Sequence, residues 1–81
     1  MKLLANAQFG KNLRSLREMR NLTQEEIVKR MQLLGSPLSR STYSLIEMGR
    51  GNIFVTDLVA IKEILCVDFS QFFQDVGTAR E

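Results

Sequence analysis

The chain has 81 residues and a formal net charge of +2; 44% of its residues are hydrophobic and 25% are charged. This composition is typical of one compact globular domain and excludes a disordered or fibrous chain, and the length leaves little room for a second core. Because histidine is absent and Cys66 is the single cysteine, disulfide frameworks, zinc sites of the usual spacing and histidine-based catalysis are excluded.

Hydrophobic residues at helical spacing predict a first helix from about Asn6 to Arg20. Phe9, Leu13 and Leu16 would form its buried stripe. A glycine inside a helix costs roughly 1 kcal/mol relative to alanine. Gly10 therefore indicates close packing against a neighbouring element, or it has no structural role.

The strongest local signal is the start of a second helix. The segment TQEE at residues 23–26 has the form of a capping box, and Leu22 and Ile27 flank it as a hydrophobic staple. The spacing of Ile27, Met31 and Leu34 predicts one buried face. Gly35 can end this helix in a left-handed conformation.

Ser39 is predicted to cap a short third helix that ends at Gly49. Tyr43 and Ile46 would face the core. The helix therefore leaves four side chains on surfaces that the core does not use, namely Arg40, Ser41, Ser44 and Leu45.

Thr56 is predicted to cap a fourth helix, Asp57 to Leu65, which turns Leu58, Ile61 and Leu65 inward. We interpret Cys66, at its end, as a buried small apolar residue rather than a redox sensor. No β-strand is needed anywhere, although residues 53–55 could be briefly extended.

Asp68 and Gln71 form a further capping pattern that predicts a short fifth helix. Three phenylalanines within five positions of this helix cannot all face inward. We therefore expect this cluster, Phe69, Phe72 and Phe73, to be mainly core, with one or two of its rings reaching a partner, so that the segment 66–76 contributes to dimerisation.

The charges are unevenly distributed. Residues 1–50 hold nine lysines and arginines against four acids, a net +5, whereas residues 51–81 hold two against five, a net −3. An anion-binding half joined to a self-associating half would show this asymmetry, and so would chance in a short chain. No run of residues reaches the roughly 18 apolar residues of a membrane span or forms a signal peptide, so we expect a cytoplasmic protein without a membrane partner.

Three segments together carry a specific resemblance. They are FGKNLRSLR (9–17), LTQEEI (22–27) and SRSTYSLIEMG (39–49), and they are similar to the DNA-binding domain of the Cro/phage-repressor (Xre-type) regulators. The match runs from about Phe9 to Phe73. The resemblance implies an all-α domain of five helices over residues 1–81, with a helix-turn-helix unit at about 23–48 whose third helix enters the major groove. Where the family has a tight turn, residues 32–38 form a longer connector, so the turn of this unit is lengthened.

The resemblance also implies a set of functional residues. It places Gln24 at a DNA phosphate, and it places Arg40, Ser41, Ser44 and Leu45 over the base edges of the groove. Arg17 and Glu47 resemble the ion pair that joins the first and third helices of the family. We further expect phosphate contacts from Thr23, Arg50, Lys11 and Arg14, although solvated surface charge explains Lys11 and Arg14 equally well.

These observations predict a sequence-specific, non-enzymatic regulator that binds double-stranded DNA. We expect it to act as a repressor that binds a pseudo-palindromic operator as a homodimer. We expect no cofactor and no metal, and the sequence shows no pocket for a small-molecule effector. The alternative is a protein-interaction module, such as an antitoxin or adaptor, that uses the same fold.

Overall fold

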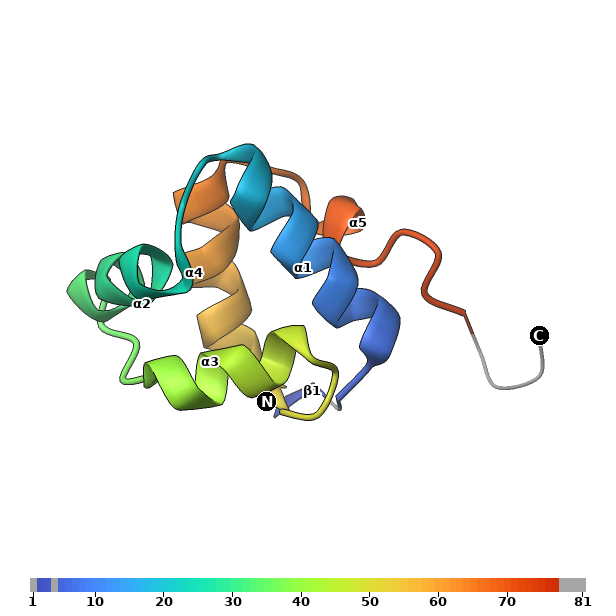
Figure 1. Ribbon diagram of the computed structural model, residues 1–81, viewed down its shortest axis with the longest axis horizontal. Coiled ribbons are helices and arrows are strands. Elements are labelled where there is room, and N and C mark those ends of the chain that lie inside the picture. Colours follow the sequence, from blue (N-terminus) through green and yellow to red (C-terminus); the bar gives the residue numbers. More distant parts are fainter. Residues whose placement is uncertain (1, 4, 78–81) are drawn as a thin grey trace.

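The computed structural model describes residues 2–3 and 5–77 and confirms the predicted all-α architecture of five helices (Figure 1). Two strands of two residues each accompany the helices, and they pair antiparallel with Lys2 opposite Phe54 and Leu3 opposite Ile53. The elements in chain order are β1 (Lys2–Leu3), α1 (Ala7–Met19), α2 (Gln24–Leu33), α3 (Arg40–Glu47), β2 (Ile53–Phe54), α4 (Val55–Leu65) and α5 (Phe69–Phe72).

The predicted helix starts of α2 and α3 are confirmed. Thr23 Oγ1 accepts the Glu26 N–H at 3.1 Å, and the Glu26 carboxylate accepts the Thr23 N–H at 2.8 Å, so both halves of the capping box form. Ser39 Oγ accepts the Thr42 N–H at 3.2 Å. Short polar side chains thus fix where the two helices of the helix-turn-helix unit begin.

Two predictions about residues 53–57 are wrong. The fourth helix begins at Val55, with Phe54 in the capping position and no side-chain cap, so Thr56 lies inside the first turn. Residues 53–54 are extended, as the sequence allowed, but they also form a strand that was not expected, because Ile53 and Phe54 find a partner in residues 2–3. This partner lies about fifty residues away in the sequence, and no local pattern indicates it.

The core contains the predicted inward-facing residues of α1, α3 and α4. Along α2, Ile27 and Met31 are fully buried, but Leu34 is 55% exposed and Val28 is buried in its place. The prediction for Leu34 fails because the helix ends at Leu33, so the next residue leaves the helical path. Gly35 follows with a φ of +95°, as predicted.

Cys66 is exposed, which corrects its interpretation as a buried residue. It follows the last residue of α4 in a left-handed conformation with a φ of +55°. This conformation turns the chain away from the core at that point, so its side chain cannot continue the buried face of α4.

Gly10 marks the closest packing between α1 and α3. A Cβ atom at this position would lie 2.7 Å from the Ile46 carbonyl oxygen and would also collide with the Glu47 carbonyl oxygen. Gly49, two residues after the end of α3, shows the same closeness to the start of α1, because a Cβ there would lie 2.6 Å from Ala7 Cα. The two helices therefore meet backbone to backbone, which settles the two interpretations of Gly10 in favour of close packing.

Candidate nucleic-acid interface

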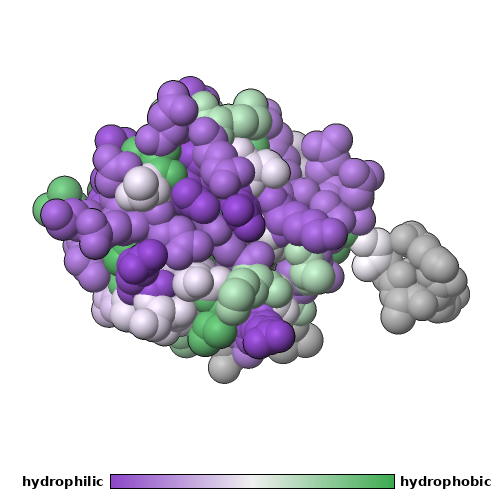
Figure 2. Space-filling model, in the orientation of Figure 1, coloured by the Kyte–Doolittle hydropathy of each residue, from purple (hydrophilic) through white to green (hydrophobic). Residues whose placement is uncertain are grey.

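The outer face of α3 carries the four residues predicted to read bases. Tyr43 and Ile46 are buried beneath it, while Arg40, Ser41 and Leu45 are exposed and Ser44 is half-buried. Figure 2 shows residues of weak polarity and some apolar residues along α3, bordered by hydrophilic residues over α1 and α2. The core thus has no use for the residues of this outer face.

A polar notch of about 280 Å³ joins the start of α2 to the start of α3. It is lined by Gln24, Arg40, Ser41 and Ser44, so the structure brings together one predicted phosphate contact and three predicted base contacts. Helix starts favour anions, because their free N–H groups and the positive end of the helix dipole face outward. The notch is therefore suited to a phosphate or to the polar edge of a base.

The predicted ion pair between Arg17 and Glu47 lies behind this notch. Arg17 Nε donates to Glu47 Oε2 at 2.7 Å, and Nη2 donates to Oε1 at 3.1 Å. The two side chains are only 9% and 3% exposed. Arg17 Nη1 also donates to the Leu22 carbonyl at 2.7 Å, so one guanidinium links α1 to α3 and to the segment before α2.

Burial and the hydrogen bonds of this network act in opposite directions on Glu47. Burial disfavours its charged form, but the hydrogen bonds from Arg17 and Gln24 outweigh burial and lower the pKa of the Glu47 carboxyl. The hydrogen bond to Glu47 raises the pKa of Arg17. Burial, followed by the neighbouring Glu47, raises the pKa of the Tyr43 hydroxyl. Near neutral pH, the pair is therefore ionised and the tyrosine is neutral.

Gln24 has a structural contact that the sequence did not indicate. Its Nε2 donates to Glu47 Oε1 at 3.0 Å, and its side chain is half-buried. One N–H of the amide is thus held by the ion pair, which leaves the other N–H and the carbonyl oxygen for the notch. No local sequence pattern indicates this bond, because Gln24 and Glu47 lie 23 positions apart in the chain.

The other phosphate candidates lie outside the notch. Lys11 and Arg14 are exposed on α1, and Arg14 Nε pairs with Glu18 at 3.2 Å, as expected for residues four apart on a helix. Arg50 is exposed in the loop that follows α3. Thr23 is exposed, and its hydroxyl oxygen already accepts the capping hydrogen bond.

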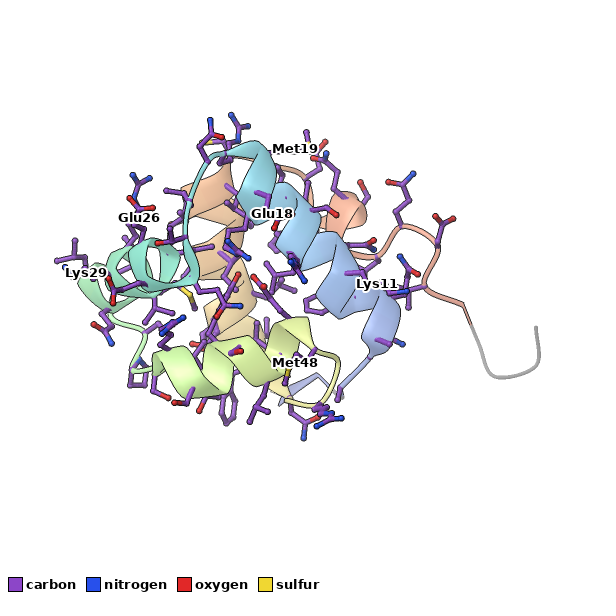
Figure 3. All side chains as sticks on the ribbon, in the orientation of Figure 1. Lys11, Glu18, Met19, Glu26, Lys29 and Met48 are labelled. Atoms are coloured by element: carbon purple, nitrogen blue, oxygen red, sulfur yellow. The ribbon has the colours of Figure 1, made fainter. Side chains whose placement is uncertain are left out.

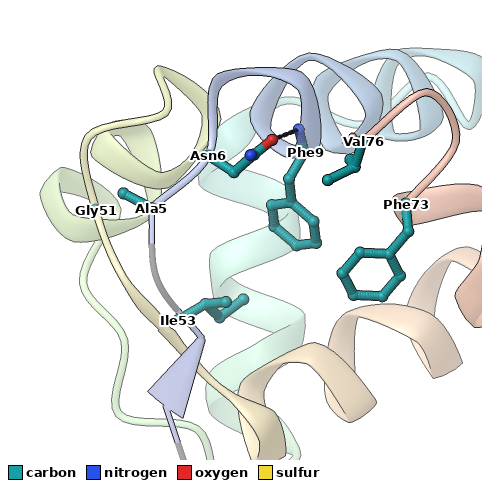
Figure 4. A pocket seen from close by; sticks show the side chains of 7 residues that line it. All are labelled: Ala5, Asn6, Phe9, Gly51, Ile53, Phe73 and Val76. Atoms are coloured by element: carbon teal, nitrogen blue, oxygen red, sulfur yellow. Dashed lines mark hydrogen bonds between the residues drawn. The ribbon is translucent and has the colours of Figure 1, made fainter. Parts of the chain in front are cut away.

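The phenylalanines near the C-terminal end divide between core and surface. Phe72 is fully buried, which corrects its place among the dimer contacts, because a buried ring cannot touch a partner. Phe69 and Phe73 are each 42% exposed. Beside Phe73 is a pocket of about 360 Å³, which Figure 4 shows between the start of α1, β2 and the last described residues. Its lining is mostly apolar and consists of Ala5, Asn6, Phe9, Gly51, Ile53, Phe73 and Val76.

Sequence reasoning missed two further groups that hold this arrangement. Asn12 Nδ2 donates to the carbonyls of Phe72 and Gln74 at 2.9 and 2.7 Å, which fastens α5 and the segment directly after it to α1. A buried hydrogen bond also joins Ser36 to Asp57. Among residues 2–3 and 5–77 there is no cluster of ligands for a metal ion, and no helix of that part is long and apolar enough to cross a membrane.

Comparison with known proteins places this geometry in context. The helix-turn-helix domain family matches residues 8–70, from the first turn of α1 into α5. The chain is also similar to the crystal structure of the restriction-modification controller protein C.AhdI from Aeromonas hydrophila, with a TM-score of 0.72 and 25% sequence identity over 83% of this chain and 94% of that chain. No curated protein matches the chain.

Proposed function

Because this chain belongs to the helix-turn-helix domain family, it is a DNA-binding transcriptional regulator, and we propose that it represses transcription as a homodimer on a pseudo-palindromic operator. The observation that carries the proposal is the outer face of α3, which the core does not use and which shares a polar notch with the start of α2. The similarity to C.AhdI, a controller protein, supports a regulatory role. Binding of this kind needs no catalytic group and no cofactor.

The proposal gives each outward residue of α3 a task in the major groove. Arg40 donates two hydrogen bonds to the edge of a guanine, and Leu45 contacts the methyl group of a thymine. Ser41 and Ser44 hydrogen-bond to neighbouring base edges. Gln24, at the rim of the same notch, donates its remaining N–H to a phosphate and so sets the register of the helix on the duplex.

The length of α3 supports the dimer. Its eight residues span about 12 Å, which covers only a few base pairs. Useful specificity therefore needs two half-sites about one helical turn apart, or ~34 Å, and two copies of the chain supply them. The exposed rings of Phe69 and Phe73, with the apolar pocket beside Phe73, support a dimer contact at that end of the molecule.

Replacing Arg40 tests base reading at one residue. We expect Arg40→Ala to weaken binding to the preferred operator by about 1 to 3 kcal/mol and to relax discrimination at one symmetric pair of positions. Arg40→Lys should restore the charge but only part of the discrimination, because lysine lacks the planar fork. The preferred operator comes from selection in a random duplex library, and each variant is then measured against a panel of single-base changes.

Arg50→Ala is the matched control for Arg40, since Arg50 is also exposed and close to α3 in the chain. It should weaken binding to all sequences about equally. A uniform loss for Arg40→Ala would instead make Arg40 a phosphate contact and leave base reading to Ser41, Ser44 and Leu45.

A second prediction concerns assembly. Phe73→Ser should weaken self-association and operator affinity together, because it removes an exposed ring at the proposed dimer contact. Light scattering and a binding titration measure the two effects. Phe73 also packs against Phe9 with ring centroids 5.5 Å apart, so thermal unfolding must show that the variant is folded.

Leu33→Ser is the control for this prediction, because Leu33 is 87% exposed at the end of α2 and has no place in the proposed dimer. It should leave self-association unchanged. A wild-type protein that is monomeric in solution and on DNA, yet binds its operator specifically, contradicts the dimer.

A further inference from the structure

The connector between α2 and α3, residues 34–39, is held by a buried hydrogen bond. Ser36 and Asp57 are only 8% and 5% exposed, and Ser36 Oγ donates to Asp57 Oδ1 at 2.8 Å. Asp57 lies in the first turn of α4. The bond therefore fastens the lengthened turn of the helix-turn-helix unit to a helix outside that unit.

Ser36 also links the end of α2 to the start of α3. Its backbone N–H donates to the Met31 carbonyl at 3.0 Å. Its hydroxyl oxygen accepts the Leu38 N–H, with 3.4 Å between the oxygen and the nitrogen. Leu38 packs against the core directly before the cap of α3 at Ser39. One serine thus contacts the last turn of α2, the residue before the cap of α3, and α4.

The start of α3 needs such an anchor. A longer connector has more conformational freedom than a tight turn, so the connector alone constrains the next helix less. Arg40 is exposed and follows Ser36 by four residues, so the backbone at the start of α3 decides where its side chain reaches. Hydrogen bonds to base edges tolerate smaller errors of distance and angle than phosphate contacts from flexible cations do.

We propose that Ser36 and Asp57 are positioning residues for operator recognition, which fix the start of α3 by anchoring the connector to α4. This inference rests on the proposed function. Losing the bond moves the start of α3, and base discrimination then falls while non-specific attraction to the phosphates stays.

The test compares sequence discrimination with non-specific binding. Ser36→Ala should reduce the affinity ratio between the preferred operator and its single-base variants by about tenfold. Affinity for unrelated duplex DNA should stay within about twofold of the wild type. Ser36→Thr keeps the hydroxyl, and a pocket of about 110 Å³ borders Ser36 and Asp57, so we expect this variant to restore discrimination. Ser36→Cys keeps the size of the side chain, but its thiol is a weak hydrogen-bond donor, so this variant should lose part of the discrimination. It replaces the alanine variant in the test if that variant does not fold.

Ile61→Val controls for a general loss of stability, because it trims a fully buried residue of α4 that takes no part in the Ser36–Asp57 hydrogen bond. All variants are measured at a temperature at which circular dichroism shows them folded. Unchanged discrimination in Ser36→Ala, or an equal loss in Ile61→Val, overturns the positioning role. A wild-type protein without any preferred sequence overturns the proposed function itself, so the two failures are distinguishable.

Discussion

Raising the salt concentration from about 50 to 200 mM is expected to weaken operator binding by about 10⁴-fold. If a dimer neutralises on the order of eight phosphates, each contact releases counterions, and the logarithm of the affinity falls with the logarithm of the salt concentration at a slope of about −7. Arg50 and Lys11 are exposed and available for such contacts. Fluorescence anisotropy with a labelled operator, repeated at several salt concentrations, gives the slope.

Single lysines make this measurement specific. Figure 3 places Lys11 on α1 and Lys29 on α2, at opposite ends of the molecule, and both are exposed. Lys11→Gln should reduce the slope by about 2 per dimer if both copies contact phosphate, whereas Lys29→Gln should leave it unchanged. A slope near zero for the wild type would contradict the proposed DNA interface and favour the alternative of a protein-interaction module.

The second large effect is expected from Arg17→Met, which should lower the free energy of unfolding by roughly 3 kcal/mol or more. The substitution leaves the Glu47 carboxylate buried without its charged partner, and it also removes the donor to the Leu22 carbonyl. Chemical denaturation of the two proteins gives the difference in stability.

Arg14→Met provides a matched comparison, because Arg14 also pairs with a glutamate through its Nε atom but is largely exposed. Exposed pairs contribute under about 1 kcal/mol, so this variant should be nearly neutral. Equal losses of stability in the two variants would show that burial does not determine how much the Arg17–Glu47 pair contributes to the free energy of unfolding.

The same pair should make stability depend on pH in the acidic range. The pKa of the Glu47 carboxyl is lowered in the folded protein from its ordinary value of 4.5. The stabilisation is therefore present above this ordinary value and is lost as the pH falls through the lower folded value. Arg17→Met should unfold with a weaker dependence on pH in that range, which a denaturation series below the ordinary glutamate value can measure.

The parts of the fold that the sequence predicts are those that short-range interactions decide. The capping box at Thr23 and the cap at Ser39 involve residues three positions apart, so the pattern and the contact coincide. The buried stripes of α1, α3 and α4 follow from helical periodicity in the same way. The positions of the outward residues of α3 follow in turn, because the inward residues fix the orientation of the helix.

The parts that could not be predicted depend on residues far apart in the chain. The strand pairing of Ile53 with Leu3 and the hydrogen bond of Gln24 to Glu47 join segments that are separate in the sequence. Cys66 illustrates a different limit. Cysteine is usually buried, but the left-handed conformation at the end of α4 leaves this residue exposed.

The close approach of Gly10 to the carbonyls of Ile46 and Glu47 means that the main chain of α1 holds the second half of α3 from behind. The four outward side chains of α3 take no part in that attachment. They can therefore be exchanged as a set without altering the scaffold that presents them. A library randomised at Arg40, Ser41, Ser44 and Leu45, with Gly10 kept, is the natural starting point for engineering variants of this small domain that recognise new operators.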